Sequence, residues 1–396
     1  MTIQEITVEQ ERINREFQAG QVLTISVGHF VHDVYSAFLA PLLPILIDKM
    51  SLSLTLAGSL SAFTQIPAIL NPLIGHFADK YNLRYLVIIA PALSATLMST
   101  MGLAPNYTVL TIMLLLAGVG VAFFHAPAPA MVGQISGRRV GKGMSWFMGG
   151  GELARTVGPL VAVWAYSTWA LEGMFRVMVI GWLTTAILFW RLRNIPVRAR
   201  KQGSMQSILP KLRTLFLPLG IIIFFRMFMV VSMTTYLPTF MKQNGASLFL
   251  GSVSLSIIEL AGVVGALSGG TLSDKIGRKR LLLVATILSP LLMFVFMNVS
   301  GWLLVPVLLL YGFFSISPGP VFLALIQDHF PENRAVSNGL YISMNFLLRS
   351  LGLFLVGMAG DMFGLDKAYL WSAGISILGV IGILYLPREQ VVKATH

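Results

Sequence analysis

Two polar stretches, GHFADKYNLRY (Gly75–Tyr85) and GGTLSDKIGRKR (Gly269–Arg280), interrupt long apolar runs of this chain. In each, a glycine stands four residues before an Asp-Lys pair, and an arginine follows shortly after. Asp79 and Asp274 are 195 positions apart in a chain of 396 residues. A polar signature that recurs at half the chain length predicts an internal repeat of two similar halves.

The composition indicates a protein embedded in a lipid bilayer. Hydrophobic residues make up 56% of the chain and charged residues only 11%, whereas soluble domains carry about 25% charged residues. The absence of cysteine excludes disulfides and thiolate metal sites. Residues 1–20 are polar and mixed in charge, so we expect no cleaved signal peptide.

The apolar runs predict an all-α membrane protein. A helix needs roughly 20 apolar residues to cross a hydrocarbon core of about 30 Å. The chain has twelve such runs, at about residues 21–47, 54–78, 84–104, 107–135, 142–167, 173–191, 213–241, 248–272, 281–300, 302–328, 335–361 and 367–386. We therefore expect twelve transmembrane helices.

The basic residues predict how these helices are oriented. Twenty-one Lys and Arg residues fall on the side that holds both termini, and four fall on the other side. The positive-inside rule then places both termini and the central loop in the cytoplasm. Because this topology accounts for the net charge of +12, we expect no nucleic-acid partner.

One long polar segment, residues 192–212, divides the apolar runs six and six. We expect a cytoplasmic N-terminal segment and a cytoplasmic tail to flank two pseudo-symmetric six-helix bundles. The expected boundaries are 1–20 for the N-terminal segment, 21–191 for the first bundle, 192–212 for the linker, 213–386 for the second bundle and 387–396 for the tail.

The repeat continues beyond the two polar stretches. ARTVGPL (Ala154–Leu160) matches LRSLGLF (Leu348–Phe354) at an offset of 194, which aligns Arg155 with Arg349. Parallel repeats about an axis along the membrane normal are typical of transporter halves. A site between such halves can open to each side of the membrane in turn, so the repeat favours a transporter that works by alternating access.

The two polar stretches resemble the signature loop of the major facilitator superfamily, and the second copy fits more closely than the first. In this resemblance, the loops would form a conformational latch that closes the cytoplasmic side and releases as the halves move. The glycines would allow close helix approach, and the aspartates would pair with nearby arginines. The latch residues are Gly75, Asp79, Lys80, Arg84, Gly270, Asp274, Arg278 and Lys279. The alternative is an ordinary charged loop.

A narrower resemblance covers residues 25–165. GHFVHDVY, GVGVAFFHAPAPA and SGRRVGKGMSWFMGGGELARTVGP are similar to the fosmidomycin-resistance branch of the superfamily. This resemblance implies proton-driven drug efflux across a bacterial cytoplasmic (inner) membrane. Gly158 and Pro159 resemble a degraded antiporter motif, in which they would shape helix packing. The sequence departs from the branch because no acid follows His125, and because Glu152 and Arg155 stand where neutral residues are usual.

Charged residues at bilayer depth are expensive, so each one is a candidate functional residue. Asp33 and Glu152 are the candidate proton-coupling residues, because a carboxylate can gain and lose a proton as its surroundings change. A static, hydrogen-bonded role is the alternative for both. Arg155 three residues after Glu152 offers that acid a structural partner.

The remaining polar residues of the apolar runs are candidate substrate ligands. Arginines can hold a phosphonate or carboxylate bidentately, and this favours an anionic or zwitterionic substrate. Arg155 and Arg349 could meet from the two halves. The full set is His29, His32, His125, Arg155, Arg226, Glu259 and Arg349. Neutralisation of the arginines by Glu152 and Glu259 is the alternative.

The sequence predicts a secondary active transporter, and we expect a proton antiporter that exports small amphiphilic or anionic compounds such as drugs. A symporter or exchanger that imports an organic anion is the alternative. We expect no enzyme, because no nucleophile elbow, zinc motif or Walker loop is present. We also expect no metal site and no cofactor besides the proton gradient. The expected partners are a small-molecule substrate, protons and the bilayer, with the protein acting as a monomer.

Overall fold

The computed structural model describes residues 17–70, 74, 83–194, 209–330 and 334–387, and these residues form helices without strands. In the first half of the sequence the helices are α2 (Ala19–Ser36), α3 (Leu39–Met50), α4 (Leu54–Gln65), η1 (Ile66–Leu70), α6 (Arg84–Ser99), η2 (Met101–Leu103), α7 (Tyr107–His125), α8 (Ala128–Ile135), α9 (Val140–Gly173), η3 (Met174–Val177) and α10 (Met178–Leu192). In the second half they are α11 (Leu209–Val231), η5 (Ser232–Tyr236), α12 (Leu237–Gln243), α13 (Leu248–Ile276), α14 (Arg278–Phe296), η6 (Gly301–Leu303), α15 (Leu304–Ile316), α16 (Pro318–His329), α17 (Arg334–Phe363), α18 (Leu365–Ser376) and α19 (Gly379–Tyr385).

These helices correspond to the twelve predicted spans. Nine of the described helical segments are long and apolar enough to cross a membrane. One of the nine, Val140–Leu192, has 53 residues and contains two spans, separated near Ala170, where φ is 55°. The shorter apolar segments Leu54–Leu70 and Arg84–Ser99 supply the other two spans. The predicted fold class is therefore confirmed.

Two of the spans are interrupted within their length. The first span breaks between α2 and α3, and the fourth breaks between α7 and α8 at Pro127. A proline has no backbone N–H and cannot continue a helix without loss of a hydrogen bond. These breaks place helix ends, rather than uninterrupted helix, beside the polar residues Asp33 and His125.

The chain divides into two compact units. The first contains Met1–Ser51 and Phe63–Lys201, and the second contains Leu52–Ala62 and Gln202–His396. The first unit has a core around Ile25, Phe124 and Phe147, and the second has a core around Ile222, Phe322 and Leu325. The predicted linker lies largely outside the described residues, and the predicted domain boundaries stay predictions.

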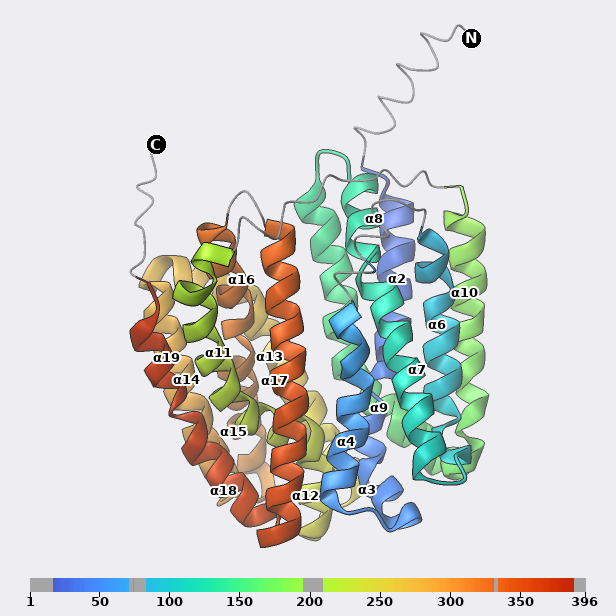
Figure 1. Cartoon of the computed structure of the whole chain (residues 1–396). Coiled ribbons are helices and arrows are strands. Elements are labelled where there is room, and N and C mark those ends of the chain that lie inside the picture. Colours follow the sequence, from blue (N-terminus) through green and yellow to red (C-terminus); the bar gives the residue numbers. More distant parts are fainter. Residues whose placement is uncertain (1–16, 71–73, 75–82, 195–208, 331–333, 388–396) are drawn as a thin grey trace, which may run out of the picture. The chain divides into compact units, whose positions relative to one another are not determined.

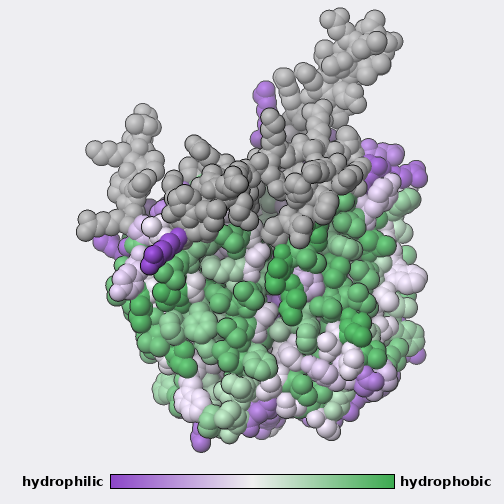
Figure 2. All heavy atoms as spheres, viewed as in Figure 1, coloured by the Kyte–Doolittle hydropathy of each residue, from purple (hydrophilic) through white to green (hydrophobic). Residues whose placement is uncertain are grey.

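The outer surface is suited to lipid. Figure 2 shows hydrophobic residues over the middle of the described surface and hydrophilic ones nearer its margins. On α10 the large side chains of Trp182, Leu183, Ile187 and Trp190 are all more than half exposed. Apolar residues that recur at this helical spacing on an exposed face indicate contact with hydrocarbon rather than water.

The start of α4 is held within the second unit by a carboxylate of α17. Asp361 accepts hydrogen bonds from the backbone N–H groups of Leu54, at 2.6 Å, and Thr55, at 2.8 Å. These N–H groups belong to the first turn of α4, where no helical carbonyl is available to accept them. Tyr236 also connects α4 to α17, because its hydroxyl lies within hydrogen-bond distance of the carbonyl oxygens of Leu54 and Leu353.

We expect Asp361→Ala to lower the stability of the protein by about 1 kcal/mol, which is typical for loss of a helix cap. The two N–H groups of α4 would lose their acceptor, while α17 itself would be unchanged. Thermal unfolding in detergent measures the effect, with Asp366→Ala as the matched control, because Asp366 lies in the first turn of α18 and its side chain is exposed. Equal melting temperatures for the two variants would contradict this role.

Candidate functional site

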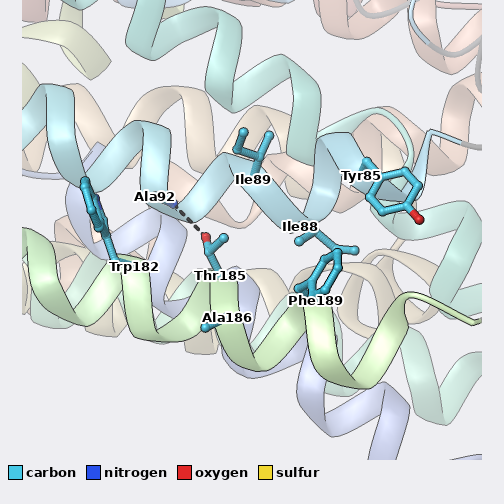
Figure 3. Close-up of a pocket in the computed structure, with 8 residues that line it drawn as sticks. All are labelled: Tyr85, Ile88, Ile89, Ala92, Trp182, Thr185, Ala186 and Phe189. Atoms are coloured by element: carbon cyan, nitrogen blue, oxygen red, sulfur yellow. Dashed lines mark hydrogen bonds between the residues drawn. The ribbon is translucent and has the colours of Figure 1, made fainter.

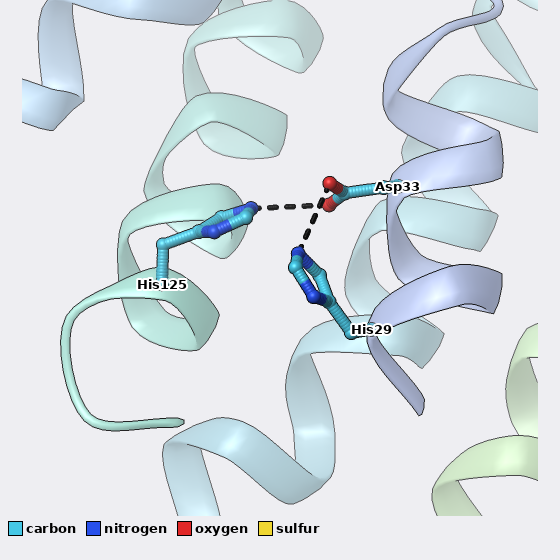
Figure 4. A group of neighbouring side chains, drawn as sticks. All are labelled: His29, Asp33 and His125. Carbon is cyan, nitrogen blue, oxygen red and sulfur yellow. Dashed lines mark hydrogen bonds and ion pairs between the residues drawn. The ribbon is translucent and has the colours of Figure 1, made fainter. Parts of the chain in front are cut away.

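Asp33 lies at the centre of a group of histidines in the first unit. His29 stands one turn earlier on α2, and its Nε2 is 3.2 Å from Oδ2 of Asp33. His125, the last residue of α7, places its Nε2 3.0 Å from Oδ1 of the same carboxylate. Figure 4 shows both imidazoles converging on Asp33 from the two helices. His32 is fully buried, with its Nε2 4.0 Å from Oδ1.

The backbone of α9 determines which nitrogen of His29 carries a proton. Nδ1 of His29 is 2.7 Å from the carbonyl oxygen of Phe147. A carbonyl oxygen only accepts hydrogen bonds, so Nδ1 must be the donor. In a neutral imidazole, Nε2 would then be a bare acceptor facing an ionised carboxylate, which is also an acceptor. The 3.2 Å contact is therefore favourable only when one of the two groups carries a proton, either His29 as imidazolium or Asp33 as the acid.

Aromatic rings form the walls of this group. The His29 ring stacks on Phe147 with a centroid distance of 4.1 Å, and the His32 ring stacks on Phe124 at 4.8 Å. The side chain of Asp33 is 13% exposed, whereas that of His125 is 33% exposed. The apolar walls strengthen the electrostatic contacts around Asp33. His125 is the most exposed member of the group.

Small residues of α9 allow it to pack directly against α2. A Cβ at Gly151 would lie 2.6 Å from Cε1 and 2.8 Å from Nε2 of His29, and 3.3 Å from Oδ2 of Asp33. At Gly158, which precedes Pro159 inside α9, a Cβ would lie 2.6 Å from the Cβ of Ala37. The close approach at Gly151 is thus made against the polar group itself.

The second candidate proton carrier lies in a different environment. Glu152 forms an ion pair with Arg155 on the same face of α9. The Arg155 side chain is 47% exposed, whereas that of Glu152 is 14% exposed. This is the structural partnership that the sequence left open as an alternative. Whether Arg155 also faces Arg349 concerns both units and stays a prediction.

The candidate ligands of the second unit gather around one buried phenol. Tyr311 interacts electrostatically with Arg226, Glu259 and Arg349. Arg226 is only 7% exposed and donates a hydrogen bond from Nη2 to the carbonyl oxygen of Ser315. Its Nη1 is buried without a hydrogen-bond partner. Tyr311 could not be identified from the sequence, because a tyrosine in an apolar run carries no signal of its partners.

A hydroxyl on the π-helical turn holds Arg349. The Arg349 Nη2 donates to Oγ1 of Thr234, which lies in η5, at 3.1 Å. Turns of this kind inside α-helices are often found at functional sites. The arrangement presents two guanidinium groups in one unit, which is suited to recognition of an anionic group.

The first copy of the predicted latch lies largely outside the described residues, which exclude Gly75, Asp79 and Lys80. Arg84 begins α6 and lies over the ring of Tyr85, 5.2 Å from its centroid. The latch function of these residues stays a prediction.

The second copy is described, and one expectation for it was wrong. A Cβ at Gly270 would meet no atom within 4 Å, so Gly270 makes no close helix approach. The adjacent Gly269 makes it instead, since a Cβ there would lie 2.4 Å from the carbonyl oxygen of Ser317. Helix rotation decides which of two neighbouring glycines faces the next helix, and the motif alone does not show this.

The cations of the second copy connect three segments. Arg278 forms an ion pair with Asp328 of α16 and lies 3.8 Å from Asp274, the partner that sequence analysis had proposed. Lys279 donates from Nζ to the carbonyl oxygen of Leu386 at 2.5 Å. Asp328 was missed because it stands far from the motif in sequence, near the end of a predicted span.

We expect Asp328→Asn to slow turnover several-fold while leaving substrate binding unchanged. The ion pair would act on the conformational change of the transporter, and conformational steps often limit the overall rate. Asp274→Asn should have the smaller effect, since its carboxylate is the more distant partner of Arg278. The pair is partly exposed, so its loss should change stability by only about 0–1 kcal/mol. Transport rates and equilibrium binding, measured on the same preparations, test this. A parallel loss of binding would defeat the latch interpretation.

The His–Asp group also contains atoms of the kinds that bind metals. Among the described residues, the ligand atoms of His29, Asp33 and His125 lie within 4.8 Å of one another. Imidazole nitrogens and a carboxylate are ordinary ligands for divalent transition metals. The sequence predicted no metal site, and that expectation stays a prediction. The carboxylate of Asp33 and the imidazole nitrogens of His29 and His125 are chemically suited to bind a cation. A proton is the smallest such cation, and it can lie between Asp33 and either histidine.

Comparisons with known proteins agree with this architecture. A family model described as Major Facilitator Superfamily matches residues 25–353. The chain is 23% identical to the Fosmidomycin resistance protein of Escherichia coli (strain K12), with 92% of each chain covered. It is 24% identical to the Multi-drug resistance efflux pump PmrA of Streptococcus pneumoniae, with 85% of this chain and 86% of that one covered.

Solved structures show the same fold. A D-xylose-proton symporter superposes with a TM-score of 0.75 at 16% identity, covering 94% of this chain and 97% of the symporter. The nucleoside transporter NupG superposes with a TM-score of 0.75 at 16% identity, covering 93% of this chain and 100% of the transporter. At these identities the likeness concerns the fold alone.

Proposed function

Because this chain belongs to the major facilitator superfamily and is thus a membrane transporter of small molecules, we propose that it exports small amphiphilic or anionic compounds in exchange for protons. The observation that carries this proposal is the 3.2 Å contact between His29 and Asp33, which is favourable only when one of the two groups carries a proton. The two relatives named for resistance and efflux support the outward direction.

The proton would be carried by Asp33 and its histidines. A proton enters through the exposed edge of His125 and is held between the Asp33 carboxylate and Nε2 of His29. The carbonyl of Phe147 accepts a hydrogen bond from Nδ1 of His29, so that Nε2 faces the carboxylate in this conformation. Movement of α9 relative to α2 would change this geometry and release the proton to the other side. Glu152, which is paired with Arg155, serves as a secondary carrier.

The substrate would be held by the cations of the second unit. Arg226 and Arg349 would bind a carboxylate, phosphate or phosphonate, with Tyr311 and Glu259 limiting where the anion can lie. The substrate-binding role of His29, His32, His125 and Arg155 of the first unit stays a prediction. The apolar and aromatic surroundings suit the hydrophobic part of an amphiphilic compound.

We expect Arg226→Met to weaken binding of anionic substrates by roughly tenfold to 100-fold, the usual cost of removing a charged hydrogen-bond donor. Binding of a neutral or cationic compound should change little. Arg226→Lys keeps the positive charge, so it should retain part of the affinity. Equilibrium binding to purified protein measures all three. Equal weakening for anionic and neutral compounds would show that the variant perturbs the fold rather than anion recognition.

The membrane setting follows from the basic residues. We propose a bacterial cytoplasmic membrane, with both termini in the cytoplasm and the protein working as a monomer driven by the proton gradient without a cofactor.

The chain has no cysteine, so single introduced cysteines can be labelled selectively with a membrane-impermeant reagent. Cysteines near residue 5 and residue 395 should react only after the membrane is opened.

Growth of a pump-deficient bacterial strain tests the function directly. The strain should express this protein and be exposed to phosphonate antibiotics, organic anions and lipophilic cations. Resistance that is present with the wild type and absent with well-expressed Asp33→Asn is the expected result. Heightened sensitivity to an anion would instead show uptake, and the protein would then be an importer on the same fold.

A further inference from the structure

A groove lies on the outside of the first unit, away from the His–Asp group. It runs between α6 and α10, has a volume of about 550 Å³ and is shown in Figure 3. Its lining is almost wholly apolar. The lining residues are Tyr85, Ile88, Ile89, Ala92, Trp182, Thr185, Ala186 and Phe189. Tyr85, Ile89 and Trp182 are each half exposed or more, so the groove opens toward the surrounding lipid.

The two helices are antiparallel, and the groove has distinct ends. Tyr85 and Phe189 face each other at one end, with ring centroids 6.5 Å apart. Beyond Ala92 and Thr185, which are joined by a hydrogen bond of 3.0 Å, the other end is closed by a hydrogen bond from Trp182 to Thr96. The side-chain polar atoms of Thr185 and Trp182 are thus already paired, which leaves an apolar floor between the two ends.

The length of the groove matches one leaflet of a bilayer. Tyr85 and Thr96 are eleven residues apart on α6, which corresponds to about 16 Å along a helix. One leaflet contributes about 15 Å, half of a hydrocarbon core of about 30 Å. An acyl chain lying in the groove would therefore reach from the interface to the middle of the membrane.

Positive charge is concentrated at one end of the groove. Arg84 lies over the ring of Tyr85 at 5.2 Å, and Arg193 lies over the ring of Phe189 at 6.0 Å. Each of the two rings that mark this end thus carries a guanidinium. The opposite end is closed by the neutral Trp182 and Thr96. Such a distribution fits a ligand with an anionic head and an apolar tail, and arginine is well suited to bind phosphate.

We propose that this groove is a binding site for one anionic phospholipid. One acyl chain lies along the groove between α6 and α10, and the phosphate is bound by Arg84 and Arg193. Basic pockets between transmembrane helices are known to bind anionic lipid headgroups. The site is independent of proton coupling, because none of its residues belongs to the His–Asp group. It joins α6, which follows the first polar loop, to α10, which precedes the central linker.

Native mass spectrometry of the purified protein tests this proposal. Protein mixed with phosphatidylglycerol should retain one lipid with an occupancy on the order of tenfold higher than with phosphatidylcholine of the same chain length. The double variant Arg84→Gln/Arg193→Gln should lose this preference. The matched control is Arg138→Gln/Arg139→Gln, which removes the same charge from two exposed arginines outside the groove and should keep the preference.

A second variant tests the tail independently of the charge. Ala186→Phe fills the exposed floor of the groove and should lower phosphatidylglycerol retention without changing any charged residue. Glycerol phosphate, which has the headgroup chemistry but no tail, should fail to displace the lipid. Equal retention of both lipids, equal behaviour of the two double variants, or displacement by glycerol phosphate would each overturn the proposal.

Discussion

Asp33→Asn is expected to abolish uphill, proton-driven transport, lowering it by roughly 100-fold or more, which is the scale of loss for an essential proton-transfer group. Asparagine has nearly the same shape as aspartate and can still form a hydrogen bond with His125. Its amide side chain, however, does not gain or lose a proton at physiological pH. The proton shared with His29 would no longer be available for exchange between the two sides.

The same variant should keep the steps that need no proton. Exchange of labelled for unlabelled substrate across the membrane of proteoliposomes should continue at close to the wild-type rate, because the ligands of the second unit are untouched. Asp366→Asn, an exposed aspartate in the first turn of α18, is the matched control and should retain uphill transport. Uphill transport that survives in Asp33→Asn would rule out this residue as the proton carrier.

Gly151→Ala is expected to reduce proton-coupled transport on the order of tenfold to 100-fold, because small displacements of catalytic groups have effects of this size. The new methyl group would lie 2.6 Å from a ring carbon of His29, and real contacts of this kind are longer. Either His29 or α9 must move, and the contact between Nε2 and Asp33 would be lost. The hydrogen bond from Nδ1 to the carbonyl of Phe147 leaves the ring little freedom to turn away.

Gly149→Ala is the control for this substitution. Gly149 lies two residues earlier on the same helix, and a Cβ there would meet no atom within 4 Å. Both changes raise helix propensity by about 1 kcal/mol, so a difference in transport between them reports the contact with His29 and not the helix itself. Transport assays in proteoliposomes at matched protein amounts measure it. Similar rates for the two variants would mean that the packing of α9 against the polar group is not needed.

The number, order and approximate limits of the helices could be predicted from the sequence because they depend on local composition. The breaks inside spans were less visible. Pro127 signals the break between α7 and α8, but Ala170 gives no local signal for the positive φ that interrupts α9. The second span is short in the structure, since its later residues lie outside the described part of the chain.

Only part of the candidate site could be predicted from the sequence. His29 and Asp33 are four residues apart, and helix periodicity places them on one face. The arrival of His125 from α7 and of the Phe147 carbonyl from α9 depends on how three helices pack, which no local pattern specifies. Gly151 likewise looked like one of several glycines, and only its position against His29 distinguishes it from Gly149.

For charged residues too, partners on the same helix could be predicted from the sequence, whereas partners on other helices could not. The pairing of Glu152 with Arg155 could be expected from their spacing of three residues, and it is observed. The pairing of Arg278 with Asp328 could not, because the two residues lie fifty positions apart and meet through the packing of α14 and α16.

Proton release on substrate binding tests the central claim most directly. Purified protein in a lightly buffered detergent solution, with EDTA present so that no metal is exchanged, is mixed with a compound to which it confers resistance, and a pH indicator follows the solution. The account predicts that the wild type releases a proton as the substrate binds and that Asp33→Asn binds the substrate without releasing one. Binding without proton release in the wild type, or equal release by Asp33→Asn, would contradict it.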